Sequence, residues 1–383
     1  MCISWCGILG TLHAQRAQIK FNPNPAWVSL NDVFMVDIII ETSSGQFIDG
    51  GEIHLNFDPA VLEIQGATGG TSLPIVLIPP TFDNTLGTFD YAAGTFFGFP
   101  TGIFTLVSIQ FRAIGGSTGS LLTFEFTPPT RLTSVTSSGT TILDTFEIGT
   151  VVVDIPTVRI SPRIILSANK DSLGTIMRHD LRSAGLIPPT EPYSSLGFTQ
   201  VGGGGETVAN AVLNVTGNNA VVDWVKVELR PESDSSAITV TQSALLQRDG
   251  DIVSVDGISP LTFEGITPGK YFVVIMHRNH LPVMTQTPLN IDATTTLVDF
   301  RSPGLNIFGA VDYRASVNSS FLLGVPGGDV EGNGDIVGED RRRTWNDRSQ
   351  EGYFTSDINM DGRVSAADRI LTWNNRDQVS FIP

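Results

Sequence analysis

The sequence has little cysteine, few basic residues and no long apolar run. Among 383 residues the only cysteines are Cys2 and Cys6, which excludes a disulfide framework across the chain. The 23 basic residues are outnumbered by 39 acidic ones, and the net charge is −16. Nucleic acid is therefore not an expected partner, because phosphate binding requires a basic surface. No segment reaches the ~20 apolar residues of a membrane-spanning helix, so no transmembrane segment is expected.

The N-terminal stretch "MCISWCGILGTLHAQ" has features of an export signal. Residues 2–12 are mostly apolar, and Leu12-His13-Ala14 resembles a small-residue cleavage site before Gln15. We therefore predict a signal peptide over residues 1–14, although the usual basic start is missing. A buried N-terminal strand is the alternative. Cleavage would remove both cysteines and place the protein outside the cell, either secreted or associated with the cell surface.

Residues 17–156 alternate between apolar and polar side chains in several short runs. In "GEIHLNFDP", Ile53, Leu55 and Phe57 point to one side, and "VSIQFRA" and "LLTFEFTP" repeat the pattern. Alternation with a period of two is typical of strands that bury one face. Glycine- and serine-rich turns such as "SSGQ" and "GGSTGS" separate the runs. The segment is therefore predicted to be a β-sandwich.

This segment also resembles a bacterial cohesin domain. The resemblance covers "FMVDIIIETSSGQFIDGGEIHLNFDPAVLEIQGA" and the later "GTFDYAAGTF" and "TGIFTLVSIQFRAI". Its most specific part runs from Phe57-Asp58-Pro59 to Leu62-Glu63. The resemblance implies a jelly-roll β-sandwich that binds a protein partner, usually a dockerin.

Residues 160–325 are predicted to form a second, Ig-like β-sandwich. A short helix is expected within "LGTIMRHDLRSAGLIPP", followed by strand-like runs such as "AVVDWVKVELR" and "GKYFVVIMHRNHLPVM". The order of a strand, an "RDGD" turn and a "PGKYFVVI" strand resembles Ig-like or prealbumin-like modules of secreted bacterial proteins. Most of the chain is thus expected to be β-structure.

Residues 329–377 contain an internal repeat with a period of 28 residues. "DVEGNGDIVGEDRRRTWNDR" aligns with "DINMDGRVSAADRILTWNNR". In each copy, oxygen-bearing side chains at positions 1, 3 and 5 precede a glycine at 6 and an aspartate at 12. A calcium ion takes six to eight oxygen ligands, and a short loop supplies them by wrapping around it.

The repeat therefore predicts two calcium ions, one in each loop. In the second copy the expected ligands are Asp357, Asn359, Asp361, Arg363 through its carbonyl, Ser365 directly or through water, and Asp368. In the first copy they are Asp329, Glu331, Asn333, Asp335 through its carbonyl, and Asp340. Glu331 is long for position 3, so the first loop fits the pattern less well. A solvated acidic turn is the alternative for either loop.

The tandem loops, each with aspartate at position 12 and a following helix, resemble a dockerin. The chain departs from the best-known dockerins at loop positions 10 and 11, which are Gly338-Glu339 and Ala366-Ala367. Partner specificity is therefore not transferable, and the helix residues are the candidates for partner binding. These are Arg341, Arg342, Arg343, Trp345, Arg369 and Trp373. For the two tryptophans, packing of the two repeats against each other is the alternative. Arginine and tryptophan are favoured at interfaces.

Three other motifs are better explained as structure than as chemistry. Ser117 in "GGSTG" lies between two strands, whereas a nucleophile elbow requires a strand-to-helix turn and a partner histidine. "HRNH", from His277 to His280, lacks further metal ligands, and a structural loop is preferred. "VGGGGET" lacks the lysine of a phosphate-binding loop. No pair of carboxylates stands out as an acid and base couple.

The leading hypothesis is a secreted, noncatalytic scaffold or adhesion protein that binds a protein partner through cohesin- and dockerin-like modules. Self-association is one form of it, since residues 17–155 hold three basic and thirteen acidic residues, hence −10, and arginines follow each calcium loop. The alternative is a carbohydrate-binding adhesin or an accessory protein of a polysaccharide-degrading system. A third hypothesis is an enzyme whose site would join His277 or His280 to acidic residues in a pocket.

Overall fold

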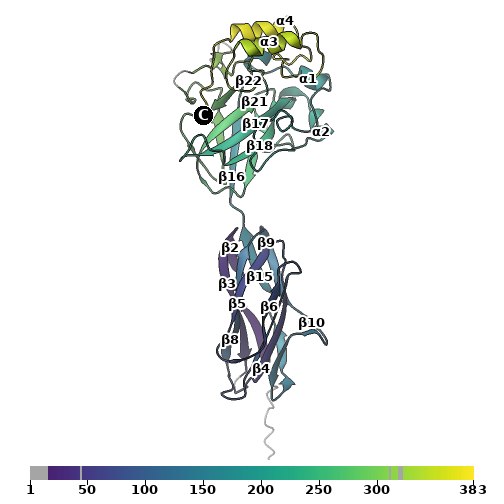
Figure 1. Ribbon diagram of the computed structural model, residues 1–383, viewed down its shortest axis with the longest axis vertical. Coiled ribbons are helices and arrows are strands. Elements are labelled where there is room, and N and C mark those ends of the chain that lie inside the picture. Colours follow the sequence, from purple (N-terminus) through teal and green to yellow (C-terminus); the bar gives the residue numbers. More distant parts are fainter. Residues whose placement is uncertain (1–15, 44, 310–311, 318–321) are drawn as a thin grey trace, which may run out of the picture. The chain divides into compact units, whose positions relative to one another are not determined.

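The structure is a computed structural model that describes residues 16–43, 45–309, 312–317 and 322–383. The chain forms two compact units, which meet in sequence at Ile155 and Pro156 (Figure 1). The predicted signal peptide over residues 1–14 and the predicted mature start at Gln15 lie outside the described residues. None of the helices in these described ranges is long and apolar enough to cross a membrane.

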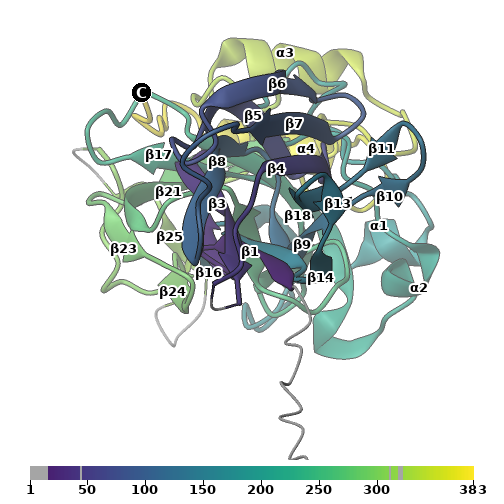
Figure 2. The same ribbon diagram turned by 90° about the horizontal axis from the view of Figure 1, so that it is seen from below.

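The first unit is a sandwich of two sheets. One sheet has the order β14 (Leu143–Phe146), β1 (Ala17–Asn22), β3 (Val33–Thr42), β8 (Ile103–Ala113), β5 (Leu62–Gly69). The other has the order β13 (Thr140–Thr141), β12 (Ser134–Ser137), β4 (Gly50–Asn56), β9 (Ser117–Phe124), β15 (Gly149–Asp154), β2 (Ala26–Ser29). It also includes β7 (Thr88–Gly94) beside β4 and β6 (Ile75–Asp83) beside β7, which lie side by side in Figure 2.

The core of the first unit lies between these sheets. Ile53 and Leu55 of β4 are fully buried, as are Val107, Ile109 and Phe111 of β8. The predicted alternation is therefore confirmed on both sheets. Burying each such side chain contributes about 1.5–3 kcal/mol relative to leaving it in water.

One part of the first unit departs from the predicted alternation. The run "LLTFEFTP" was expected to place Leu122, Phe124 and Phe126 on one buried face. Phe126 instead leaves the sheet and begins a two-stranded hairpin of β10 (Phe126–Thr127) and β11 (Arg131–Leu132). Its ring packs on Phe146 at 4.7 Å between centroids, which keeps it half buried.

The second unit also has two facing sheets. The smaller has the order β20 (Leu261–Glu264), β16 (Thr157–Arg163), β24 (Thr295–Asp299). The larger has the order β19 (Ile252–Val253), β18 (Val240–Gln247), β17 (Val221–Pro231), β21 (Gly269–His277), β22 (His280–Met284), with β23 (Leu289–Ile291) paired to β21. Val158 of β16 and Val227 of β17 belong to the same buried core. The mainly-β fold with a second sandwich is therefore confirmed.

Short elements connect the strands of the second unit. The predicted helix within residues 173–189 is a single turn, α1 (Asp180–Ser183). The other short elements are η1 (Ser167–Asn169), α2 (Asn210–Leu213), η2 (Gly217–Asn219), β25 (Ala315–Ser316) and β26 (Leu323–Gly324). Trp224 of β17 is fully buried.

The predicted calcium repeat belongs to the same compact unit as the second sandwich. Its helices are α3 (Gly338–Asn346) and α4 (Ala366–Asn374), which lie side by side in Figure 1. The sequence predicts residues 160–325 and residues 329–377 as two distinct domains. In the structure, Met360 of the repeat lies in the sandwich core and Tyr353 packs against it. The repeat thus buries apolar surface that it could not bury alone.

Candidate calcium loops and partner-binding face

The two loops of the repeat turn in the same way. The position-1 carboxylate of the first loop (residues 329–340), Asp329, accepts hydrogen bonds from the backbone N–H groups of Asn333 and Gly334, both at 3.0 Å. In the second loop (residues 357–368), Asp357 accepts from positions 5 and 6 at 3.1 and 2.8 Å. The glycines at position 6 have φ of 85° and 88°, which favours glycine over other residues.

The position-12 carboxylates close each loop onto its helix. Asp340 accepts from the N–H groups of loop positions 2 and 3 at 2.8 and 3.1 Å, and from position 9 at 2.8 Å. Asp368 accepts from the same positions at 2.9, 3.0 and 2.8 Å, and also from the Ser365 hydroxyl at 3.1 Å. Ser365 in turn caps α4 by accepting from the Ala367 N–H. Both carboxylates are fully buried.

The two copies are joined by backbone pairing at position 8. Ile336 of the first loop pairs with residues 377 and 378, which follow α4. Val364 of the second loop pairs with residues 349 and 350, which follow α3. In each pairing, position 8 of one copy bonds to the residues that follow the helix of the other copy. Because the two copies exchange roles between the two pairings, they are related by an approximate two-fold arrangement. Ile336 and Val364 are themselves buried.

The chemistry of the donor set fits an oxygen-ligated cation. Burial raises the pKa of Asp329 to about 7, and it raises the pKa of Asp357 to about 7. A buried carboxylate is costly unless a cation or hydrogen bonds offset its charge. Both oxygens of each carboxylate accept hydrogen bonds from backbone N–H groups of their own loop, which directs them into the loop. Oδ1 of Asp335 is also buried, without a hydrogen-bond partner among the described residues.

The remaining predicted ligands are turned toward neighbouring groups. Glu331 pairs with Arg343 at 2.6 Å, and Asn333 accepts from the Asp335 N–H at 3.2 Å. Asn359 donates to Asp361, another predicted ligand of the same loop, at 3.0 Å. In the described part of the chain, no three His, Cys, Asp or Glu side chains form a group that could hold a metal ion. The calcium ligand sets therefore remain predictions.

The helices that follow the loops present a face of arginine and tryptophan. Trp345 and Trp373 are about half exposed, at 48% and 49%. Arg348 and Arg369 lie over the Trp345 ring at 4.6 and 4.7 Å from its centroid. Arg376 and Arg341 lie over Trp373 at 4.5 and 4.9 Å. Each ring thus receives one guanidinium from the residues just after its own helix and one from the other helix. We call these six residues the Arg–Trp face.

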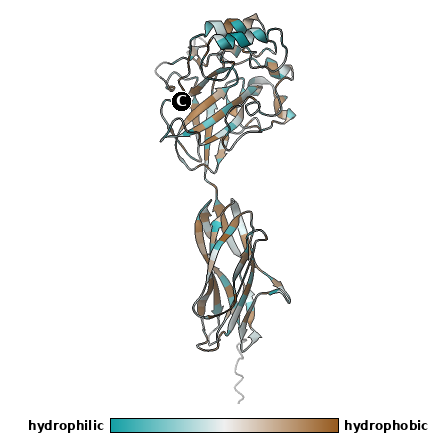
Figure 3. Cartoon of the chain, in the orientation of Figure 1, coloured by the Kyte–Doolittle hydropathy of each residue, from teal (hydrophilic) through white to brown (hydrophobic). Residues whose placement is uncertain are grey.

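The other two predicted partner-binding residues are engaged in ion pairs. Arg342 pairs with Glu339 one turn away, and Arg343 pairs with Glu331 and Glu339. An open cavity of about 300 Å³ lies along the face and is lined by Gly338, Arg341, Arg342, Trp345 and Arg369. Figure 3 colours α3 and α4 mainly as hydrophilic. The exposed face is therefore cationic and aromatic rather than apolar.

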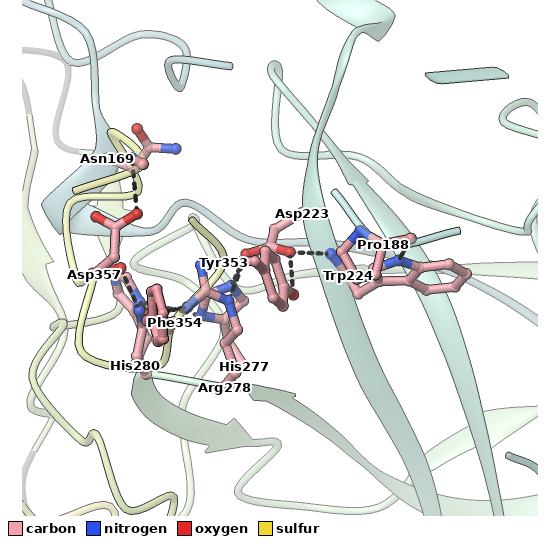
Figure 4. Close-up of polar contacts among 12 residues, drawn as sticks. Asn169, Pro188, Asp223, Trp224, His277, Arg278, His280, Tyr353, Phe354 and Asp357 are labelled. Atoms are coloured by element: carbon pink, nitrogen blue, oxygen red, sulfur yellow. Dashed lines mark hydrogen bonds and ion pairs between the residues drawn. The ribbon is translucent and has the colours of Figure 1, made fainter. Parts of the chain in front are cut away.

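A buried polar network fixes the second loop to the sandwich (Figure 4). Asp223 of β17 accepts from the Arg278 guanidinium at 2.9 Å and from the Tyr353 hydroxyl at 2.7 Å. Arg278 also donates to the Phe354 carbonyl and stacks on the Tyr353 ring at 4.2 Å. Asn279 donates to the backbone carbonyl of Asp357 at 2.7 Å. The "HRNH" turn between β21 and β22 therefore supports the second loop, as a structural interpretation of the motif expects, but Arg278 Nη2 and His280 Nε2 are buried without a hydrogen-bond partner among the described residues.

The charges of this network are matched inside the protein. Burial alone would raise the pKa of Asp223, but Arg278 and His277 hold it well below its usual range. Burial lowers the pKa of His277 and, together with His277 and Arg278, that of His280. Both histidines are at most 3% exposed, so solvent and substrate do not reach them. His277 does lie 3.2 Å from Asp223, but this contact is within the core rather than in an open pocket.

The network was not recognised from the sequence. Its one local signal is Asp223, a single charge within the apolar run "AVVDWV". A charge in such a run is expected to have a buried partner. The partners, Arg278 and Tyr353, lie 55 and 130 positions away along the chain, and no local pattern connects them.

Several aromatic side chains of the first unit are exposed, and two of them meet a neighbouring ring at an angle. They include Trp27, Phe82, Phe96, Phe97, Phe99 and Phe146. Phe99 meets Phe47 with ring planes tilted by 44°, and Phe146 meets Phe126 at 39°. Ser117 was expected in the connection between two strands; it is instead the first residue of β9, and its hydroxyl accepts a hydrogen bond from the Gly119 N–H at 3.1 Å.

Comparison with protein-family models and with curated proteins found no match. Among solved structures, the third cohesin of ScaC from Acetivibrio cellulolyticus, in complex with the ScaB dockerin, is 14% identical; it covers 36% of this chain and 98% of its own, with a TM-score of 0.31. A non-cellulosomal cohesin from Archaeoglobus fulgidus is 16% identical and covers 36% of this chain and 91% of its own, with a TM-score of 0.30. A type I cohesin–dockerin complex from Clostridium thermocellum is 13% identical and covers 37% and 93%, with a TM-score of 0.30. With identities below 25% and TM-scores below 0.5, these matches establish neither a family nor a function.

Proposed function

We propose that the protein is a secreted, noncatalytic binding protein that associates with another protein through the Arg–Trp face. The observation that carries this proposal is the repeated stack of two guanidinium groups on each half-exposed tryptophan. Arginine and tryptophan are enriched among residues that dominate binding energy. A stacked arginine keeps its planar donors directed outward, so less side-chain freedom is lost when a partner binds.

The chemistry of this face calls for an acidic partner. Arg341 and Arg369 contact rings rather than carboxylates, so their donors are available to a bidentate carboxylate. Arg342 and Arg343 are already neutralised by glutamates of the same segment. We therefore assign the main binding role to Arg341, Arg369 and the two tryptophans, and a minor role to Arg342 and Arg343.

Calcium, in this proposal, holds the two loops and thereby the relative position of α3 and α4. The ligands would be those of the loop pattern, with the position-1 carboxylates Asp329 and Asp357 supplying the buried negative charge. A hard cation prefers carboxylate, amide and carbonyl oxygens. Chelation would then loosen the helices and weaken partner binding without any chemical change at the Arg–Trp face.

A second copy of the chain is the partner we test first. The first unit is acidic, with three basic and thirteen acidic residues over 17–155, hence −10. Opposite charges on two surfaces speed association and orient the encounter. Contact between two different surfaces does not close as a simple two-fold dimer, so repetition gives rings or filaments. The cohesin-like sequence pattern of the first unit points to the same kind of role.

The test is calorimetric titration of the first unit (residues 16–155) with the second unit (residues 156–383) in calcium, since each has its own core. Binding should weaken strongly in a second unit that carries Arg341→Glu and Arg369→Glu. Arg159→Glu, at an exposed arginine of β16, is the control for each single reversal, Arg341→Glu or Arg369→Glu, and should bind normally. No binding at about 100 μM, a limit of ~5.5 kcal/mol, would overturn self-association.

A further inference from the structure

The second unit buries three charged residues at alternate positions of β17. Lys226 and Glu228 are each 1% exposed and Arg230 is 5% exposed. We call them the β17 triad. Because side chains alternate along a strand, all three lie on the face opposite the one that packs Val225 and Val227 into the core. A polar sheet face is normally left in water, so its burial here requires an explanation.

The triad lines a cavity of about 300 Å³ within the second unit. Leu196, Gly197 and Thr199 are exposed and mark its mouth. Phe198, Ile238 and Met276 supply apolar walls, while Glu331 and Gly332 of the first calcium loop complete the lining. The volume is at the small end of ligand pockets, which suits a molecule of about one sugar ring or less.

The hydrogen-bonding capacity of the triad is not fully used. Glu228 accepts from Lys226 at 2.5 Å with one oxygen and from Arg230 at 2.8 Å with the other. Arg230 also donates to the carbonyls of Ser235 and Pro383 at 3.0 and 2.7 Å. The Lys226 ammonium has three donors, but among the described residues it meets, beyond Glu228, only the Met276 sulfur at 3.9 Å. A thioether is a weak acceptor, so Lys226 has capacity for an oxygen ligand.

The neighbours of Lys226 do not supply that oxygen. Glu331 at the edge of the cavity is already paired with Arg343 at 2.6 Å. Ser243, directly across from Lys226 on β18, lies on the same face of the sheet and is fully buried. Its hydroxyl has no hydrogen-bond partner among the residues that the structure describes. The triad itself contains two cations and one carboxylate, and a buried ammonium is stabilised by a second anion.

We propose that this cavity binds a small carboxylate ligand through the Lys226 ammonium. The carboxylate would accept charge-assisted hydrogen bonds from Lys226, and the rest of the ligand would pack on Phe198 and Met276. A sugar acid and a short aliphatic acid share this chemistry. This inference does not depend on the proposed protein-binding function, because none of the Arg–Trp face lines the cavity.

The test is calorimetry and ligand-observed NMR on the full chain, with glucuronate, glucose and propionate as probes. Lys226→Met keeps the length of the side chain and leaves Glu228 paired with Arg230. It should weaken binding of the carboxylates by about ten-fold or more. Lys270→Met is the matched control, because Lys270 is half exposed and pairs with Glu232 away from the cavity. Glucose, which lacks the carboxylate, should bind at least about ten-fold more weakly than glucuronate.

The outcomes distinguish the two ligand sources and the purely structural role. Comparable binding of propionate and glucuronate would assign the site to the carboxylate alone, whereas binding of glucuronate only would assign it to a sugar acid. No binding of either at about 50 mM, or equal binding by Lys226→Met, would overturn the proposal. If circular dichroism shows that Lys226→Met does not fold, Phe198→Trp is used to narrow the cavity while the triad stays intact. Unchanged binding by that variant would likewise overturn the proposal.

Discussion

The two loops of the calcium repeat share their sequence pattern and their turn, but they are held by different neighbours. The second loop is supported from the sandwich: Asn279 donates to the Asp357 carbonyl, and Arg178 donates to the Asn359 carbonyl at 2.7 Å. The first loop is drawn toward α3 by the pairing of Glu331 with Arg343. Ligand spacing is therefore a property of the sequence, whereas the availability of each ligand depends on what packs around the loop.

The largest effect is expected from removing the contacts by which the sandwich supports the second loop. Asp223→Asn leaves the Arg278 guanidinium buried without a counter-charge, and we expect the second unit to lose about 3–5 kcal/mol of stability. Denaturant unfolding of the full chain, followed by tryptophan fluorescence, measures this loss. Asp377→Asn, at a side chain that is 87% exposed, should change stability little. A loss of similar size in both variants would contradict the role assigned to Asp223.

Removing the position-1 carboxylates compares the loops directly. We expect Asp329→Asn and Asp357→Asn each to lower calcium affinity at the altered loop by about ten-fold or more, or ~1.4 kcal/mol. Because the second loop contacts the sandwich core, Asp357→Asn should also abolish more of the rise in melting temperature that calcium produces. Calorimetry and thermal unfolding with calcium or chelator give both quantities. Equal melting behaviour of the two variants would show that the loops are not held differently.

These comparisons also show what the sequence can predict. The alternation of apolar and polar side chains was sufficient to predict strands and their buried faces: Ile53 and Leu55 are buried as it indicated, and so are Val107 and Ile109. The 28-residue repeat was sufficient to find both loops and the helix residues Arg341, Trp345, Arg369 and Trp373. It did not predict that each tryptophan is covered by an arginine of the other helix, because that contact depends on how α3 and α4 pack. Nor did it predict the network of Asp223 and Tyr353, which are brought together only by the tertiary fold.

The stability of the second unit should depend on pH through the buried histidine His277, which belongs to the network that supports the second loop. Burial lowers the pKa of His277 in the folded state, so below its unfolded value of about 6.5 the unfolded chain binds a proton that the folded chain does not. The groups that face it are Asp223, Arg278 and His280. Stability should be fully present above pH ~6.5 and fall by about 1–2 kcal/mol as pH decreases toward 5. Burial lowers the pKa of His280 as well, so His277→Gln should reduce this dependence without abolishing it, whereas His179→Gln, at a half-buried histidine of the same unit, should leave it unchanged.

The smallest expected effect comes from making the first loop more like the second. Arg343 corresponds to Leu371 in the second copy, so Arg343→Leu removes the ion pair that turns Glu331 away from its loop. We expect calcium affinity of the first loop to rise by about three-fold, or ~0.6 kcal/mol. Arg342→Leu is the control, because Arg342 pairs with Glu339 and not with a loop ligand. Calorimetric titration of both variants measures the difference, and a fall in affinity for Arg343→Leu would contradict this account of the first loop.

The central claim is that the Arg–Trp face mediates association, with calcium holding its two helices in place. The most direct measurement is sedimentation velocity of the full chain in calcium, in chelator, and in calcium with Arg341→Glu and Arg369→Glu. We expect oligomers, seen as faster-sedimenting species, for the unaltered chain in calcium, and mainly monomer in chelator and for the double variant. A monomer under all three conditions, or larger species unaffected by the double variant, would contradict it.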